Sequence, residues 1–277
     1  MALHLMYITK NTEVARVAES AGVDRIFVDM EYIGKADRQC GMDTVQSRHT
    51  VDDVKNVRAA ISASELLVRV NPIHDKTDEY CSTEDEIDAV IDAGADIIML
   101  PYFKTACEVQ RFINAVNGRA KTMLLVETVS AVENIEEILA VEGIDEVFIG
   151  LNDLSLGYGK KFLFELLSDG TVERLCKIFA QAKIPYGFGG IASLGKGMLP
   201  SEYVIREHYR LGSTAAILSR SFCDVNRVLD INVIEKTFCK GVADIRNFEK
   251  ECAKNAFDAE KNKNDIVKIV NKITESM

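Results

Sequence analysis

This chain of 277 residues has few positive charges relative to negative ones, with 33 Lys and Arg against 43 Asp and Glu. The formal net charge of -10 argues against a nucleic-acid partner, because such binders need a basic surface. Long apolar runs are also missing: none approaches the roughly 20 residues of a membrane helix, so we expect no membrane partner. The apolar start at residues 1–8 is too short for a signal peptide and is predicted to form a strand.

Cysteine pairs and linkers are missing as well. The seven cysteines are odd in number and include no Cys-x-x-Cys pair. They therefore indicate neither a disulfide framework nor a zinc ribbon, and they fit a reducing compartment, so we expect a cytoplasmic protein. No Pro/Gly/Ser-rich linker divides the chain, and its length is normal for one α/β barrel. We expect a single domain over residues 1–277.

The chain does contain a repeated pattern in which a glycine precedes a short apolar run. Glycine suits the left-handed residue that closes a helix, and an unbroken apolar run is typical of a strand buried in a parallel sheet. The pattern occurs at Ala21-Gly22-Val23-Asp24 before Arg25–Asp29, at Ala93-Gly94-Ala95-Asp96 before Ile97–Pro101, and at Glu142-Gly143-Ile144-Asp145 before Glu146–Gly150. Capping boxes are predicted to start helices at Thr50/Asp53, Thr83/Glu86, Thr105/Glu108 and Ser130/Glu133.

Eight such strand–helix units can be placed along the chain. The number of units favours a closed (β/α)8 TIM barrel over an open, doubly wound α/β sheet. After about Glu235, apolar positions alternate with Lys and Glu, which predicts additional C-terminal helices outside the barrel. The strands are predicted near residues 3–8, 25–30, 66–71, 96–101, 122–127, 146–151, 184–189 and 214–219.

Polar residues follow four of these strands, and the carboxyl ends of the strands carry the chemistry in this architecture. A charge directly after a buried strand is costly unless it is paired. Two carboxylates from adjacent strands suit a hard divalent cation such as Mg²⁺ or Mn²⁺. Arg69 would then receive an anionic substrate, or alternatively pair only with Glu127 inside the barrel. The residues are Asp29 and Glu31, Arg69 and Asn71, Glu127, and Asn152 and Asp153.

The chain resembles the metal-dependent oxo-acid aldolases and citrate lyase β-like enzymes from about residue 12 to residue 222. The resemblance is carried by Phe27-Val-Asp-Met-Glu31, Val68-Arg69-Val70-Asn71, Ala95–Pro101, Val126-Glu127-Thr128, Ala131-Val132-Glu133-Asn134 and Gly150-Leu151-Asn152-Asp153-Leu154-Ser155. It implies a carbon–carbon lyase that cleaves or forms a pyruvate-derived oxo acid through an enolate. It also implies a homo-oligomer, since the C-terminal helix of such enzymes often packs on a neighbouring subunit.

By this resemblance, Glu127 and Asp153 match the metal ligands. The ion acts as a Lewis acid that stabilises the enolate, and Arg69 steadies the enolate oxygen. The backbone around Leu151 and Asn152 matches the segment that holds the substrate carboxylate. Asp29 and Glu31, at the end of the second strand, are further candidate catalytic residues.

The sequence departs from the family pattern in three places. Tyr32 stands where these aldolases often carry an acid–base histidine, and Leu125 stands where they tend to carry glutamine. The segment from about residue 33 to residue 49 has the character of an insertion. Within it, His49 is a candidate for the missing base or a surface histidine beside a helix cap, and Arg48 is a candidate reader of an anionic group or an exposed loop residue.

Two questions remain open at this point. The glycine-rich stretch at residues 187–192, extended by Gly195 and Gly197, either forms a phosphate site after the seventh strand or turns tightly beside the substrate. The activity is predicted as an oxo-acid lyase. The rivals are an acyl-CoA ester lyase of the citryl- or malyl-CoA type and a barrel that binds an oxo acid without turnover, which the missing histidine favours.

Overall fold

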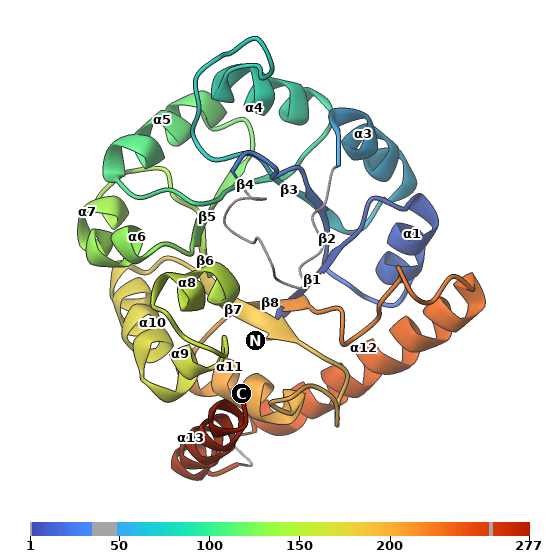
Figure 1. Cartoon of the computed structure of the whole chain (residues 1–277). Coiled ribbons are helices and arrows are strands. Elements are labelled where there is room, and N and C mark those ends of the chain that lie inside the picture. The colour runs from blue at the N-terminus through green and yellow to red at the C-terminus, as the bar shows by residue number, and fades with distance from the viewer. Residues whose placement is uncertain (1, 35–48, 255–256) are drawn as a thin grey trace.

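The computed structural model describes residues 2–34, 49–254 and 257–277. Eight parallel strands form a closed barrel, with β8 paired back onto β1, and helices surround it (Figure 1). This confirms the predicted (β/α)8 barrel, and each strand begins and ends within two residues of its prediction. The strands are β1 (His4–Ile8), β2 (Arg25–Asp29), β3 (Glu65–Arg69), β4 (Ile97–Leu100), β5 (Lys121–Val126), β6 (Glu146–Ile149), β7 (Tyr186–Ile191) and β8 (Ala215–Leu218).

The helices lie outside the strands in chain order, and their predicted starts are partly corrected. Capping boxes at Thr50 and Thr105 are confirmed, but Ser82 rather than Thr83 caps α4, and Thr128 rather than Ser130 caps α6. Thr83 is fully buried, and its hydroxyl bonds to the loop at His74 instead. The first helices are α1 (Thr12–Ser20), α3 (Val51–Ala60), α4 (Thr83–Asp92), α5 (Ala106–Val116), α6 (Val129–Glu133), α7 (Ile135–Leu139) and α8 (Leu151–Gly157).

The chain ends in helices, as predicted, and the last of them lies outside the ring (Figure 1). α12 packs against both α11 and α1 and so completes the ring, whereas α13 packs against α9 and α11. α13 is anchored by Asn262, which is buried and donates to the buried Glu207 carboxylate at 2.9 Å. These later helices are α9 (Glu165–Ser168), α10 (Thr171–Ala182), α11 (Ser201–Leu211), α12 (Ile231–Ala253) and α13 (Ala259–Glu275).

The core has two layers, one between strands and helices and one inside the barrel. The inner layer fills the barrel with large side chains, so the barrel is a packed core and not a pore. Its buried members are Met6, Phe27, Leu67, Ile97, Met99, Met123, Leu125, Phe148 and Ala215.

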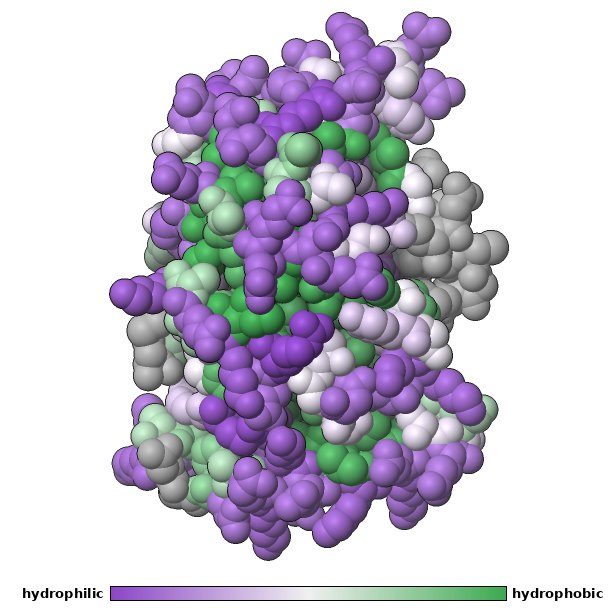
Figure 2. Space-filling model, turned by 90° about the vertical axis from the view of Figure 1, so that its left-hand side faces the viewer, coloured by the Kyte–Doolittle hydropathy of each residue, from purple (hydrophilic) through white to green (hydrophobic). Residues whose placement is uncertain are grey.

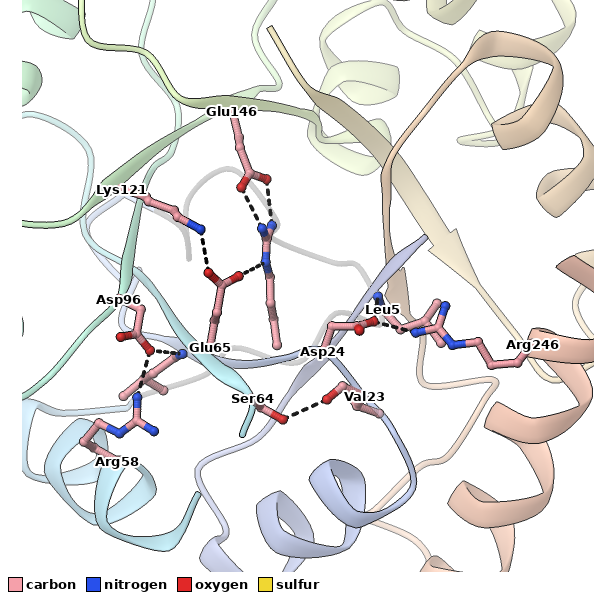
Figure 3. Close-up of polar contacts among 12 residues, drawn as sticks. Leu5, Val23, Asp24, Arg58, Ser64, Glu65, Asp96, Lys121, Glu146 and Arg246 are labelled. Atoms are coloured by element: carbon pink, nitrogen blue, oxygen red, sulfur yellow. Dashed lines mark hydrogen bonds and ion pairs between the residues drawn. The ribbon is translucent and has the colours of Figure 1, made fainter. Parts of the chain in front are cut away.

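Ion pairs close the amino end of the barrel. Arg25, only 3% exposed in its side chain, donates to both oxygens of Glu146 at 2.7 and 2.6 Å and to Glu65 at 2.9 Å. Figure 3 shows these two carboxylates reaching in from β3 and β6, with Lys121 on the outer side of Glu65. These four charges satisfy one another, so this cluster is structural and the chemistry belongs at the other end of the barrel.

The face of the molecule drawn in Figure 2 is predominantly polar. Figure 2 shows one face on which hydrophilic side chains surround small hydrophobic areas. Across the described ranges, no helix is both long and apolar enough to span a membrane.

Candidate active site

A cavity of about 750 Å³ lies at the carboxyl ends of the strands. Its wall brings together side chains that are far apart in the sequence, because the ends of parallel strands meet at one face of the barrel. Glu31 is fully buried just behind this wall. The predicted site residues that line the cavity are Asp29, His49, Arg69, Glu127, Leu151, Asn152 and Asp153.

Arg69 is held by two carboxylates from β2 and the loop after it. Asp29 and Arg69 are register partners on adjacent strands. Arg69 donates from Nε and Nη2 to the two oxygens of Asp29 at 2.8 and 2.7 Å, and its Nη1 lies 3.3 Å from Glu31 Oε2. Burial disfavours the charged guanidinium, but the two carboxylates outweigh that effect and raise the pKa of Arg69. In the described residues Arg69 therefore pairs with Asp29 and Glu31, not with Glu127.

Glu127 directly follows β5 and carries a buried carboxylate, with 4% of the residue exposed. Its Oε1 accepts the backbone N–H of Tyr102 at 3.0 Å. Tyr102 follows β4 with φ of 50°, a left-handed conformation that is strained for a tyrosine and aims its N–H at this carboxylate. On the other side, a Cβ at Gly150 would lie 2.8 Å from the Cβ of Glu127, so only glycine leaves room for it.

The strand-end residues hold more negative than positive charge. Burial, and then the charge of Glu31, raise the pKa of Glu127 to about 8; Arg69 opposes this shift and Asp153 adds to it. At the ends of β2, β3, β5 and β6, Asp29, Glu31, Glu127 and Asp153 outnumber Arg69, while Lys10 and Arg220 add positive charge to the same cavity after β1 and β8. Oxygen donors with excess negative charge suit a divalent cation, which would relieve the repulsion among them. The described ranges contain no group of three or more His, Cys, Asp or Glu that could hold a metal ion.

The segment after β6 forms the short helix α8 beside Glu127. Leu151 is buried at its first position, and a Cβ at Gly189 of β7 would come within 2.7 Å of the Leu151 Cδ1 atom. The Asn152 side chain is exposed and donates to Asp153 Oδ1 at 3.1 Å. The predicted metal ligand Asp153 and the predicted substrate-binding residues Leu151 and Asn152 therefore lie together on the cavity wall.

His49 lies next to Asp29 on the cavity wall, whereas Tyr32 does not line the cavity. The backbone N–H of Asp29 donates to His49 Nδ1 at 3.0 Å. This bond requires a lone pair on Nδ1, so the proton of the neutral imidazole is on Nε2. Tyr32 is 43% exposed, and its ring packs against Tyr80 with centroids 5.6 Å apart. Arg48 lies outside the described residues.

The glycine-rich stretch forms β7 itself rather than the loop after it, which corrects the prediction. A Cβ at Gly187 would lie 2.5 Å from the carbonyl oxygen of Ala215 and 2.7 Å from the Phe148 ring. Gly189 makes room for Leu151 in the same way. Gly189 and Gly190 line the cavity, and close packing explains why these positions are glycine.

The model of the HpcH/HpaI aldolase/citrate lyase family matches residues 4–164, more than half of the chain. The chain belongs to this family. Family membership confirms the predicted resemblance and the prediction of a carbon–carbon lyase. The match covers β1 to β6, and so it includes every strand that supplies a predicted site residue.

Named family relatives are similar over part of the chain. The chain is 27% identical over 201 residues to a 4-hydroxy-2-oxovalerate aldolase from Novosphingobium aromaticivorans, which covers 62% of this chain and 69% of that protein. It is 25% identical over 178 residues to a 2-keto-3-deoxy-L-rhamnonate aldolase from Escherichia coli O157:H7, which covers 53% of this chain and 58% of that protein. It thus spans little more than half the length of the second relative.

A solved structure of a HpcH/HpaI aldolase/citrate lyase family protein from Burkholderia cenocepacia has the same fold. Its TM-score is 0.61 at 18% sequence identity, and the match covers 79% of this chain and 89% of that one.

Sequence reasoning missed three contributors to this family site. Tyr102 acts through its backbone N–H, which no side-chain pattern reveals. Gly150 matters because of what lies against it in space. Glu86 was interpreted as part of a capping box, yet its buried carboxylate binds Asn71 behind the cavity wall.

Proposed function

We propose that this family member is a divalent-metal-dependent lyase that cleaves or forms a pyruvate-derived oxo acid through an enolate. The observation that carries the proposal is the buried Glu127 carboxylate on a cavity wall that it shares with Asp153 and Arg69. Burial and the charge of Glu31 also raise the pKa of Glu127. Such an arrangement is costly for the protein alone and becomes favourable when a cation binds. The names of the relatives, which are aldolases of 2-oxo acids, support the substrate class.

Glu127 and Asp153 would hold the ion, Mg²⁺ or Mn²⁺, through carboxylate oxygens. When bound, the ion supplies a Lewis acid to the keto oxygen of the substrate. Arg69 supplies fixed positive charge at the same oxygen, because Asp29 and Glu31 hold its guanidinium in place. Backbone groups of Leu151 and Asn152 bind the substrate carboxylate.

His49 and Asp29 would act on the substrate hydroxyl group, whose oxygen is attached to one of the two carbons of the bond that breaks. Because Nδ1 of His49 is engaged by the Asp29 N–H, the neutral ring can only donate from Nε2. We therefore assign His49 as a hydrogen-bond donor to the oxygen rather than as the base, a role that neutral imidazoles fill in other enolate-forming barrels. Asp29, directly beside it, would take the hydroxyl proton through one water, because Arg69 already occupies both of its oxygens at 2.8 and 2.7 Å.

Two expectations from the sequence belong to the same proposal. A homo-oligomer would use the C-terminal helices as contacts between subunits, and the protein would work in the cytoplasm.

The proposal is tested by cleavage of 4-hydroxy-2-oxo acids, with pyruvate release followed through lactate dehydrogenase. We expect release with Mg²⁺ or Mn²⁺ and none in a chelator. Citryl-CoA and malyl-CoA serve as parallel substrates. Turnover of a CoA ester without turnover of the oxo acid would replace this proposal with the CoA-ester reading, and binding of both without turnover would support a non-catalytic barrel.

A further inference from the structure

Asn71, which follows β3, holds the loop after β2. Its Oδ1 atom accepts the backbone N–H groups of Tyr32 at 2.9 Å and Ile33 at 3.0 Å. The residue before them, Glu31, is fully buried and has its carboxylate against Arg69. Asn71 therefore sets the path of the backbone immediately after the Glu31 carboxylate.

Asn71 is in turn oriented by Glu86 of α4. The Glu86 carboxylate accepts the side-chain Nδ2 of Asn71 at 2.8 Å and its backbone N–H at 3.2 and 3.3 Å. The two residues, Asn71 and Glu86, are only 2% and 4% exposed. Because both donors of Asn71 face Glu86, its amide oxygen is fixed toward Tyr32 and Ile33.

Glu86 is an unusual choice for this position. Burial raises its pKa, and the donors of Asn71 oppose that shift. The start of α4 does not need it, because Ser82 already accepts the N–H of Asp85. The structure therefore gives this buried carboxylate one described task, which is to hold Asn71.

We propose that Glu86 is a positioning residue of the active site, which acts through Asn71 to keep Glu31 against Arg69. The chain of contacts runs from α4, through the end of β3, to the β2 loop and then to the guanidinium on the cavity wall. Only the kinetic readout below rests on the proposed function.

The first test is Glu86→Gln, which keeps the shape but turns one acceptor into a donor facing the donors of Asn71. We expect faster hydrogen exchange at the amides of Tyr32 and Ile33. The metal-dependent exchange of pyruvate methyl protons should fall about tenfold or more, as for residues that orient a metal site from behind.

The matched control is Glu249→Gln at the amino end of the barrel. Glu249 is 2% exposed and also accepts a backbone N–H, that of Leu3, at 2.7 Å. Both variants should lower the melting temperature, but only Glu86→Gln should slow pyruvate exchange when both are assayed well below that temperature. An equal loss in the two variants would reduce Glu86 to a stability role and overturn the proposal.

A second variant tests the polarity of the contact. Asn71→Asp alone sets two carboxylates face to face and should be worse than Glu86→Gln. When Asn71→Asp is combined with Glu86→Gln, the contact between the two side chains again has a hydrogen-bond donor facing an acceptor. The introduced glutamine can donate to the introduced aspartate, whose other oxygen still accepts from Tyr32 and Ile33. The double variant should recover amide protection and most of the exchange rate.

Unchanged protection of Tyr32 and Ile33 in Glu86→Gln, or no recovery in the double variant, would overturn the proposal. If the wild type exchanges no pyruvate protons at all, the proposed function fails, while the amide-protection comparison still decides the role of Glu86.

Discussion

The guanidinium of Arg69 donates two hydrogen bonds to the carboxylate of Asp29, with Nε 2.8 Å from Oδ1 and Nη2 2.7 Å from Oδ2. This geometry leaves Nη1 for Glu31 and fixes the plane of the fork at the cavity wall. A planar fork held in this way presents positive charge at one place, which a flexible ammonium group does not.

Arg69→Lys should therefore lower kcat for oxo-acid cleavage by about 100-fold, although the positive charge remains. The loss of buried, charge-assisted hydrogen bonds should also cost about 2 kcal/mol of stability. Arg25→Lys is the control, since Arg25 is also buried and paired with two glutamates at the opposite end of the barrel. It should lose similar stability but little kcat, and equal kcat losses would contradict the assigned role of Arg69.

His49 should tolerate glutamine far better than phenylalanine. Glutamine retains a side-chain N–H donor, so His49→Gln should stay within about tenfold of the wild-type kcat, whereas His49→Phe should lose about 100-fold or more. If His49 were the base, neither substitute could accept the proton, and both variants would be equally inactive. Cleavage kinetics of the two variants distinguish these roles.

Gly150→Ala should displace the Glu127 carboxylate. The added Cβ would lie 2.8 Å from the Glu127 Cβ and 2.9 Å from its Oε2, and the φ of -80° at this position allows alanine. Titration with Mn²⁺ should show affinity about tenfold weaker or worse. Gly157→Ala, whose Cβ would meet only Val129 closely at 3.1 Å, should bind Mn²⁺ as the wild type does. Unchanged affinity in Gly150→Ala would remove Glu127 from the metal site.

His208 should make the fold sensitive to acid. It is fully buried, its ring stacks on Phe188 with centroids 3.8 Å apart, and burial lowers its pKa to about 3. In the unfolded chain the His208 imidazole binds a proton near pH 6.5. Above that pH the buried neutral ring therefore makes its full contribution to the free energy of unfolding. This contribution is lost as the pH falls toward 3, by about 1.4 kcal/mol per pH unit. In urea unfolding at several pH values, His208→Gln should be less stable at pH 7 but show a shallower loss below pH 6.5; an equally steep loss would refute this account.

The barrel could be predicted because each unit carries its own local signals. Gly22, Gly94 and Gly143 all have positive φ where a helix ends before a strand, as the sequence pattern indicated. The charged residues at the strand ends were found for a similar reason, since Glu127 and Asp153 each follow an apolar run.

The partners of those residues could not be predicted in the same way. The choice of Asp29 over Glu127 as partner of Arg69 depends on the register between β2 and β3. The contact between Glu86 and Asn71 joins a helix to a strand end across 15 residues, and Thr83 and Glu86 happen to have capping-box spacing that hid it. Gly187 and Gly189 fell within the predicted seventh strand but were also interpreted as part of a stretch after it, because their packing against Phe148 and Leu151 is invisible in the sequence.

The measurement that tests the central claim most directly is proton–deuterium exchange at the pyruvate methyl group in heavy water, followed by NMR. It would be run with Mg²⁺, Mn²⁺ or a chelator on the wild type, Glu127→Gln and the control Glu137→Gln, an exposed residue of α7. We predict exchange that needs the metal, disappears in Glu127→Gln and persists in Glu137→Gln. Exchange that survives the chelator or the Glu127 substitution, or no exchange by the folded wild type with either metal, would contradict enolate formation at this site.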